Sequence, residues 1–409
     1  MSYIVRRPTE ADHVAMVRTF VDVMNQRYPD EEIVAHREGT ELDRSWIAVD
    51  GDAIVGSATG HTFQLALPGG GCAPLGGLSL VSVVPTHRRL GIMTDLVDRF
   101  FADCVERQEP LAGLFASDAG IYGRFGFGAA TRMANLTIER DRAAFGTFVP
   151  PGRMRWHKAA DAADELAPIF ERTMVDRPGE LARSASTWAS LRERATKTPD
   201  GKPAWVAIHE PDGGGAPDGY VVYRIESKWI DHTAQNEVHI IELVGVGAVR
   251  VALWHFLLNL DLIRTVSDRN ARPDEPVADA LVDPRQLRIR GIYDQLWLRV
   301  LDVGLALAAR TYNVTGEVTI EVVDDLLADR GGTFRLVVRE AAGGAECHRV
   351  EADPQLVVTA RALASAYLGD RSFRGLAGAG LVEVRDPAAA ALADAMFAVF
   401  PRPQCLSTF

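Results

Sequence analysis

Residues 78–101 pass from a buried strand through a basic turn into an amphipathic helix, and this order constrains the chain more than any other feature. Residues 78–84 are apolar and rich in β-branched side chains, which favours a central strand, and Pro85 cannot donate a hydrogen bond to a neighbouring strand. Beyond the turn, apolar residues recur at helical spacing in two rows: Ile92, Leu96 and Phe100, then Met93, Val97 and Phe101. We therefore expect a strand, a short turn over residues 86–91, and a helix.

The turn has the features of an anion site. A strand that leads directly into a helix start aims several unpaired backbone N–H groups at one point, and the helix dipole makes that point positive. Gly91 allows close approach because it has no Cβ, and Arg88 and Arg89 add charge and a geometry suited to phosphate oxygens. The sequence predicts a diphosphate site here, with an ordinary solvated helix end as the alternative.

Two motifs carry a family resemblance. Residues 88–93, RRLGIM, resemble the Arg/Gln-x-x-Gly-x-Gly/Ala loop with which GCN5-related N-acetyltransferases (GNATs) bind the pyrophosphate of acetyl-CoA; Met93 departs from the small last residue. Tyr122, Gly126 and Phe127 match the second GNAT signature, Tyr-x-x-x-Gly-Phe. With VxPTHRRxG followed by GIYGRFGFG, and Phe409 as the last residue, the whole chain resembles the enhanced intracellular survival (Eis) family of N-acetyltransferases.

The resemblance implies a set of site residues and their roles. Backbone N–H groups near residues 81–83 are expected to face the thioester, because neighbouring strands splay apart there in this fold. Tyr122 is expected to protonate the departing sulfur, and the terminal carboxylate of Phe409 to reach the active site as the base. The full expected set for binding acetyl-CoA is Val81, Ser82, Val83, Arg88, Arg89, Leu90, Gly91, Ile92, Met93, Thr94 and Ser117.

The chemistry of amine acetylation explains why a base is needed. An amine like that of lysine has a pKa near 10.4, so roughly one molecule in a thousand is neutral at pH 7. An α-carboxyl group has a pKa near 3.5, so the Phe409 carboxylate is ionised and can hold the ammonium and accept its proton. Because Pro401 and Pro403 prevent a helix, the tail should run extended; a disordered tail is the alternative.

The acceptor side is expected near the first helices, which wall the acceptor site in enzymes of this fold. Acidic residues accumulate over residues 22–43, which indicates either a rim that attracts amines or an ordinary solvated face. Asp22, His36 and Leu80 are the expected acceptor contacts. A cationic acceptor, whether an aminoglycoside, a polyamine or a lysine side chain, suits the formal charge of −11, which argues against nucleic acid as a partner.

At 409 residues the chain is too long for one core, and we expect an α+β protein of three domains. The first, residues 1–145, is the catalytic GNAT fold. The second, residues 146–290, repeats its hairpin, strand and helix without the paired arginines or the tyrosine motif, and reads as a degenerate GNAT-like copy. The third, residues 291–409, is sterol-carrier-like by resemblance, with strands expected at 316–323, 333–339 and 356–359.

Further sequence features bound the setting of the protein. No apolar run is long enough to span a membrane and the N-terminus lacks a signal peptide, so we expect a cytoplasmic protein. The ten histidines form no HxxxH or HExxH pattern, so no metal is expected. The resemblance implies a homohexamer. The alternative function is a non-catalytic protein that binds acyl-CoA or lipid through its C-terminal domain.

Overall fold

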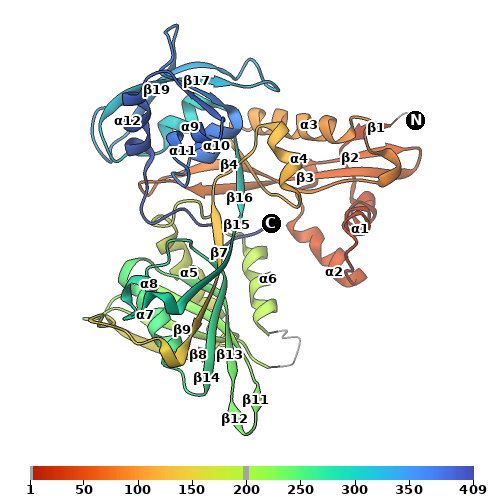
Figure 1. Ribbon diagram of the computed structural model, residues 1–409. Coiled ribbons are helices and arrows are strands. Elements are labelled where there is room, and N and C mark those ends of the chain that lie inside the picture. Colours follow the sequence, from red (N-terminus) through yellow and green to blue (C-terminus); the bar gives the residue numbers. More distant parts are fainter. Residues whose placement is uncertain (1–2, 197–201) are drawn as a thin grey trace.

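Residues 78–101 lie in β4 (Cys72–Val83), the turn that follows it and α3 (Ile92–Glu106). The computed structural model describes residues 3–196 and 202–409. β4 lies in the middle of the first sheet (Figure 1). The other strands of this sheet are β1 (Ile4–Arg6), β2 (Ser45–Asp50), β3 (Ala53–Ala66), β5 (Leu111–Phe115), β6 (Gly128–Ala129) and β16 (Leu296–Val300). Their order is β1-β2-β3-β4-β5-β16-β6, with β4 and β5 parallel and every other pair antiparallel.

Helices cover both faces of the first sheet. α3 packs on the face that carries Trp46, and Phe100 and Phe101 of α3 lie in the same core. α1 (His13–Val23) and α2 (Asp30–Ala35) cover the opposite face, where they pack with Ile47. The two faces follow from the pleat, because successive side chains of a strand point in opposite directions.

A second sheet forms the lower body in Figure 1. Its order is β15-β7-β14-β13-β10-β9-β8, with β13 and β14 parallel. Its strands are β7 (Arg132–Glu139), β8 (Arg153–Lys158), β9 (Trp205–Glu210), β10 (Gly219–Glu226), β13 (Asn236–Val244), β14 (Ile263–Ala271) and β15 (Leu287–Asp294). Its helices are α5 (Ala163–Met174), α6 (Ala185–Thr196), α7 (Gly247–Leu258) and α8 (Val277–Ala280), and the hairpin β11 (Trp229–Ile230) with β12 (Thr233–Ala234) projects from its end.

The first two sheets exchange chain segments, so they do not divide at residues 145 and 290. The chain leaves the first sheet after β6, and β7 pairs with β14 and β15 of the second sheet. It returns after β15, and β16 fills the position between β5 and β6. The sheets therefore separate near residues 130 and 295. The pairing of the strands places both of these boundaries.

The C-terminal body is a smaller sheet in the order β19-β18-β17-β20-β21, covered by four helices among the described residues. The strands β17 (Gly316–Val323), β18 (Gly332–Val338) and β20 (Leu356–Thr359) match those expected from the sequence. The other elements are α9 (Val303–Ala309), β19 (Ala345–Arg349), α10 (Ala360–Ala366), α11 (Phe373–Gly378), β21 (Val382–Val384) and α12 (Pro387–Phe397). Its core is continuous with the ends of β3, β4 and β5.

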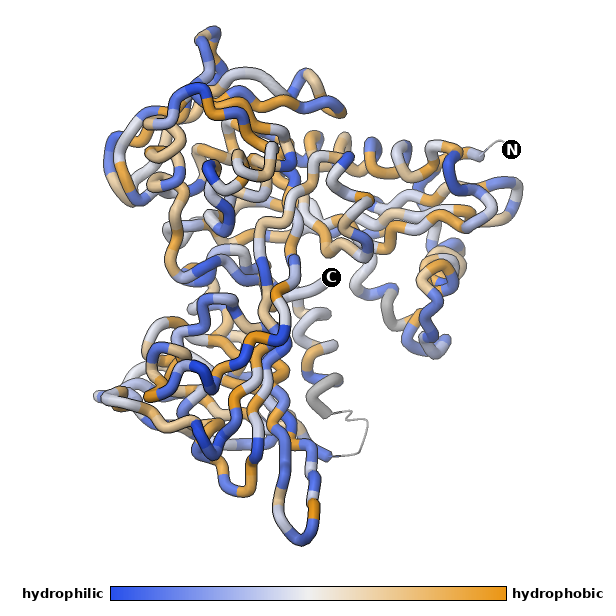
Figure 2. Tube along the Cα trace, viewed as in Figure 1, coloured by the Kyte–Doolittle hydropathy of each residue, from blue (hydrophilic) through white to orange (hydrophobic). Residues whose placement is uncertain are grey.

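The tail after α12 runs without helix or strand between the upper and lower bodies, where the C-terminus lies in Figure 1. Cys405 is fully buried there, so this part of the tail is packed against its surroundings. In Figure 2 the tip of the uppermost loop and most of the β11–β12 hairpin are hydrophilic. Within the described chain, no helix has the length and apolar character needed to cross a membrane.

Candidate active site

The turn after β4 has the geometry of an anion site. A 3-10 turn, Pro85–His87, leads to Arg88 and Arg89, whose side chains are exposed and form no ion pair within the described part of the chain. Gly91 starts α3 with φ of +86°, and a Cβ there would have only an ordinary contact, so the backbone conformation explains the glycine. The first bond inside the helix runs from the Asp95 N–H to the Gly91 carbonyl, which leaves the N–H groups of residues 92–94 available.

A third arginine, not singled out in the sequence analysis, lies beside this turn. Arg124 belongs to the YGRFGF motif, and its Nη2 lies 3.5 Å from the Sδ of Met93. Arg124 is therefore placed within reach of an anion bound at the start of α3, where its charge would add to that of Arg88 and Arg89. Its position inside the tyrosine motif was a signal that could have identified it. Leu90, by contrast, offers a half-exposed apolar side chain.

The strands β4 and β5 separate beside the turn. They pair only from Leu75 with Leu111 to Gly77 with Gly113, although both strands continue further. The β3–β4 register shifts opposite Leu80, which has φ of +47°, so a bulge lies in β4 at this point. The Val84 N–H donates to the Val55 carbonyl of β3. Because N–H groups alternate along a strand, that of Val83 points into the gap toward β5.

Ser82, also expected in this site, uses its side chain elsewhere. Its hydroxyl lies 2.8 Å from that of Ser57, and both residues are buried between β3 and β4. By the same alternation the Ser82 N–H points toward β3, so neither its hydroxyl nor its N–H faces the gap. The side chain of Val81 is buried as well, because it belongs to the core under α3.

Tyr122 lies at the far side of the gap. Asp118 begins the short helix α4 (Ala119–Tyr122) by accepting the Gly120 N–H at 2.8 Å. Tyr122 is only 6% exposed. Burial raises its pKa above the ordinary value of 10.0, a hydrogen bond with Ser117 opposes this, and the nearby Asp118 carboxylate raises the pKa further. The phenol is therefore protonated at neutral pH and can donate a proton.

The ring of Phe409 is seated against the first sheet at the same edge. Its centroid lies 4.6 Å from the ring of Phe63 and 5.1 Å from that of Phe115, the last residue of β5. Gly77 makes room for it, because a Cβ there would stand 2.8 Å from Phe409 Cε2 and 2.6 Å from Phe63 Cε2. Phe115 precedes Ser117 by two residues, so the end of the tail and Tyr122 are placed at the same end of β5.

Buried ionic groups clamp the tail before it reaches Phe409. The Glu180 carboxylate accepts the N–H groups of Leu406 (3.1 Å) and Ser407 (3.0 Å), and Arg177 binds Glu180 at 2.6 Å. Arg183 donates to the Ser407 hydroxyl at 2.9 Å. Charge-assisted hydrogen bonds of this kind are stronger than neutral ones. The segment between α5 and α6 therefore fixes the direction of the tail.

Two adjoining hollows lie under α1 and α2, where the acceptor was expected. The larger, of about 530 Å³, is lined by Asp22, and the smaller by Leu80; they share Val21, Tyr28 and Ile33. The side chain of His36 lies outside the described residues, although its backbone starts a 3-10 turn. Asp22 and Leu80 therefore line separate hollows that share three residues.

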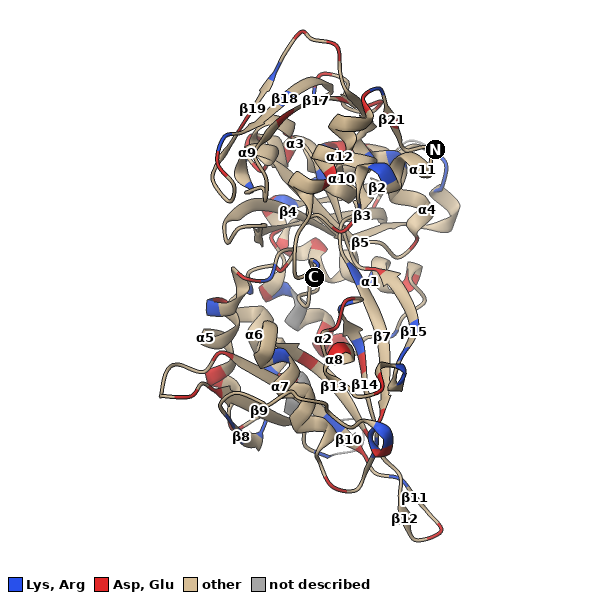
Figure 3. Ribbon diagram, turned by 60° about the vertical axis from the view of Figure 1, so that its left-hand side comes forward, with Lys and Arg blue, Asp and Glu red and all other residues tan. Residues whose placement is uncertain are grey.

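The acidic residues of this region divide into two groups. Asp30 binds Arg18 at 2.8 Å, Asp43 binds Arg107 at 2.8 Å, and Glu41 accepts the Thr62 N–H. Asp22 and Glu32 form no ion pair within the described residues and line the two hollows. Acidic residues of α1 and α2 are marked in Figure 3. Arg18 and Arg27 line the same hollow as Asp22, so this hollow carries charges of both signs, whereas Glu32 is the charged residue that lines the smaller one.

Another hollow, of about 380 Å³, lies where the tail meets the second body. Its lining includes Trp188, Arg192, Val222, Glu242, Leu406 and Thr408. Glu242 is held by Arg183 and by the Tyr220 hydroxyl, so its charge is already compensated.

The second sheet repeats the strand and helix of the first without an open turn. Between β13 and α7 the paired arginines are missing, and Arg250 is buried and bound to Glu275 at 2.7 Å. A buried, paired guanidinium cannot face a phosphate. This agrees with the expectation of a degenerate copy that does not bind coenzyme A in the same way.

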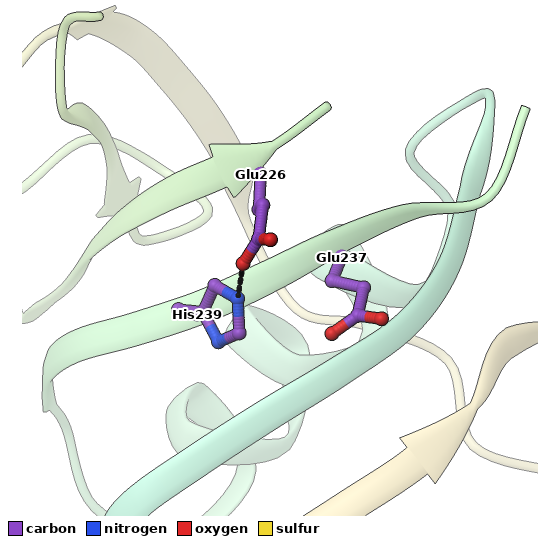
Figure 4. A group of neighbouring side chains, drawn as sticks. All are labelled: Glu226, Glu237 and His239. Carbon is purple, nitrogen blue, oxygen red and sulfur yellow. Dashed lines mark hydrogen bonds and ion pairs between the residues drawn. The ribbon is translucent and has the colours of Figure 1, made fainter. Parts of the chain in front are cut away.

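A group of possible metal ligands lies on the second sheet, away from this site (Figure 4). Glu226, Glu237 and His239 place one ligand atom each within 4.8 Å of one another. His239 Nε2 lies 3.1 Å from Glu226, and Lys228 lies 3.8 Å from Glu237. The group joins two strands, so no short histidine pattern could have indicated it. Its side chains are partly or fully exposed and engaged with each other or with Lys228, which is typical of surface ion pairs.

Three family models match successive parts of the chain. A model described as an acetyltransferase (GNAT) domain matches residues 4–130, a second GNAT model matches residues 179–300, and a sterol carrier protein domain matches residues 303–406. The N-acetyltransferase Eis of Mycobacterium bovis is 31% identical, with 97% of each chain covered. An uncharacterized N-acetyltransferase of Streptomyces avermitilis is 35% identical over 88% of this chain and 87% of the relative. The crystal structure of Eis1 from Mycobacterium abscessus superposes with a TM-score of 0.87, at 33% identity and full coverage of both chains.

Proposed function

This chain belongs to the Eis family of N-acetyltransferases, and we propose that it transfers the acetyl group of acetyl-CoA to a primary amine of a cationic acceptor. The acceptor classes that fit are aminoglycosides, polyamines and lysine side chains. The observation that carries this proposal is the arrival of the tail at the end of β5, where Phe409 contacts Phe115 beside the segment of Tyr122. On this proposal, the Phe409 carboxylate and the Tyr122 phenol act on the same thioester in the gap between β4 and β5.

The residues around Gly91 fit the pyrophosphate of acetyl-CoA. Free N–H groups at residues 92–94, together with Arg88, Arg89 and Arg124, would hold its charges, and the Val83 N–H would face the thioester in the gap. The bound cosubstrate supplies an acetyl group activated as a thioester. The chain's own residues then have to orient the amine, remove its proton and protonate the departing sulfur.

Proton transfer is assigned to two groups. The α-carboxylate of Phe409 is ionised at neutral pH and accepts the proton of the incoming ammonium at a carboxylate oxygen, directly or through water. As the amine nitrogen bonds to the acetyl carbon and the C–S bond breaks, Tyr122 donates its phenolic proton from Oη to the sulfur, and the proton that the new amide nitrogen loses restores the phenol through solvent. Asp22 and Glu32 attract the cationic acceptor into the hollows under α1 and α2. On the family resemblance, we also propose a cytoplasmic homohexamer.

The lipid-binding alternative gains no support from the C-terminal body. Its interior is filled by fully buried side chains that include Leu336, Leu363, Tyr367 and Phe373. Packing of this kind is typical of a structural core. Relatives named N-acetyltransferases over nearly the whole chain also favour the catalytic reading.

Release of free CoA in the presence of a panel of amines tests the proposal. Acetyl-CoA is supplied with a polyamine, an aminoglycoside, a lysine peptide or a neutral arylamine, and thiol formation is followed with a thiol reagent. We expect turnover with at least one cationic primary amine and none with the arylamine, and the mass of the product should rise by one acetyl group. Thiol release that does not depend on any amine would contradict the proposal.

Gly77→Ala tests the placement of the tail. The new Cβ would stand within 3 Å of the rings of Phe63 and Phe409, so one of them must move, at a cost of about 1–3 kcal/mol for overpacking. We expect kcat to fall about tenfold because Phe409 carries the base. Gly378→Ala is the matched control, since a Cβ at Gly378 meets nothing within 4 Å. Equal activity of the two variants would show that the Phe409 ring does not need this position.

A further inference from the structure

The segment that carries Tyr122 is pressed against α10 of the C-terminal body. A Cβ on Gly123 would stand 3.0 Å from Arg361 Nη1, and one on Gly128 would stand 2.5 Å from Ser365 Oγ. The Arg361 guanidinium also lies over the ring of Trp297 in β16, at 5.9 Å from its centroid. Both glycines therefore mark places where α10 approaches the backbone on either side of the tyrosine turn.

A buried ion pair supports the same segment from below. Gly126 has φ of +79°, and a Cβ there would stand 2.8 Å from the Arg299 guanidinium. Arg299 is fully buried in β16, and its carboxylate partner is Asp324 of the C-terminal body. Its Nε and Nη1 atoms have no partner among the described residues. Asp324 thus compensates the charge of the Arg299 guanidinium, which lies against Gly126 in the segment that carries Tyr122.

Asp324 is itself held in place by its own loop. Its carboxylate accepts the N–H groups of Leu326 (3.3 Å) and Leu327 (3.0 Å), and these two leucines pack against the core of the first sheet. β16 lies between β5 and β6, the two strands that the tyrosine segment connects. The segment that carries Tyr122 therefore crosses β16, and the buried charge of Arg299 in β16 is balanced by Asp324 of the C-terminal body.

We propose that Asp324, acting through Arg299, and Arg361 are positioning residues that hold Tyr122 at its place beside the gap. This gives the C-terminal body a role in catalysis, as a brace for the tyrosine turn, in addition to carrying the tail. The inference rests on the proposed role of Tyr122 as the acid. Neither Asp324 nor Arg361 contacts the turn at Gly91 in the described structure. Substitutions of either residue should therefore affect kcat more than the binding of acetyl-CoA.

Asp324→Asn keeps the shape of the side chain and removes its charge. Because a displacement of about 1 Å in a reacting group costs on the order of a hundredfold in rate, we expect kcat to fall about 10- to 100-fold. The KM for acetyl-CoA should change by no more than about threefold, as for an interaction made mainly in the transition state. Arg361→Ala should act in the same direction, and Arg361→Lys, which keeps the charge, should recover part of the loss.

Glu275→Gln is the matched control, because Glu275 and Arg250 form a pair as deeply buried as that of Arg299 and Asp324, but in the second sheet. We expect similar losses in melting temperature for the two variants and a loss of kcat only for Asp324→Asn. The double variant Tyr122→Phe with Asp324→Asn should be no slower than Tyr122→Phe alone, since both act through one group.

Two results would overturn the inference. One is an equal kcat for Asp324→Asn and Glu275→Gln, and the other is a double variant whose losses multiply, as independent effects do. If Tyr122→Phe itself retained the wild-type kcat, the proposed role of Tyr122 would fail instead. The two failures are therefore distinguished by the single tyrosine variant.

Discussion

Tyr122→Phe is expected to lower kcat for acetyl transfer about 10²- to 10⁴-fold, the usual contribution of a general acid, while leaving the fold intact. The substitution removes only the hydroxyl group. Tyr122 is buried against Phe127, with ring centroids 6.2 Å apart in an edge-to-face arrangement that phenylalanine can keep. The KM for acetyl-CoA should therefore change little. Steady-state rates of CoA release with a saturating amine measure both quantities.

The pH dependence gives this prediction a second readout. Because burial raises the pKa of Tyr122, the phenol carries its proton through the neutral range, and activity that depends on this proton is lost only as pH rises through the raised pKa. The wild type should show this alkaline limb in kcat, and Tyr122→Phe should not.

Tyr312→Phe is the control for Tyr122→Phe. Tyr312 is as deeply buried, and its hydroxyl donates to the Leu307 carbonyl at 2.7 Å in the C-terminal body. Its loss should lower stability by about 1 kcal/mol without changing the alkaline limb. A Tyr122→Phe enzyme with the wild-type rate and the wild-type alkaline limb would remove Tyr122 from the mechanism.

The family and the three-part α+β fold expected from the sequence are confirmed by the comparisons. The local elements could be predicted because the spacing of apolar residues along a short stretch of sequence indicates a strand or a helix. The run over residues 78–84 predicts the second half of β4, and the helical rows that start at Ile92 predict α3. The left-handed conformation at Gly91 is likewise a local property of the turn.

The partners of each element could not be predicted in the same way. The alternation of side chains along β16 does not indicate that this strand enters the first sheet between β5 and β6. Pairing depends on which strand edge is free when the bodies assemble. For the same reason, no pattern in the sequence indicates that Asp324 compensates Arg299 or that Glu180 binds the tail. The expected roles of Tyr122 and of the residues around Gly91 stay predictions, although their placement is compatible with them.

The acidic region over residues 22–43 shows where a count of charges stops being informative. The sequence offered an amine-attracting rim or a solvated face for the whole group. The structure assigns partners to Asp30, Glu41 and Asp43 and leaves Asp22 and Glu32 at the hollows. A charge becomes available for binding only when no neighbour compensates it, and neighbours are a tertiary property.

The second large effect concerns the carboxylate of Phe409. A variant that carries one additional glycine after Phe409 keeps the ring in its seat against Phe63 and Phe115 but moves the terminal carboxylate by one residue, about 3.5 Å along an extended chain. We expect kcat to fall about 10²- to 10⁴-fold, because a general base works only within hydrogen-bond reach of its proton. Deletion of Phe409 should be at least as harmful, since it removes both ring and carboxylate.

Phe409→Leu provides the matched comparison, because it keeps an apolar side chain and leaves the carboxylate on the same residue. Its kcat should stay within about tenfold of the wild type, well above that of the glycine-extended variant. The clamp by Glu180 on Leu406 and Ser407 is unchanged in all three variants, so the rest of the tail keeps its direction. Rates of CoA release at saturating acetyl-CoA and amine rank them. If the extended variant turned over as fast as the wild type, the proton of the amine would have to leave through another group.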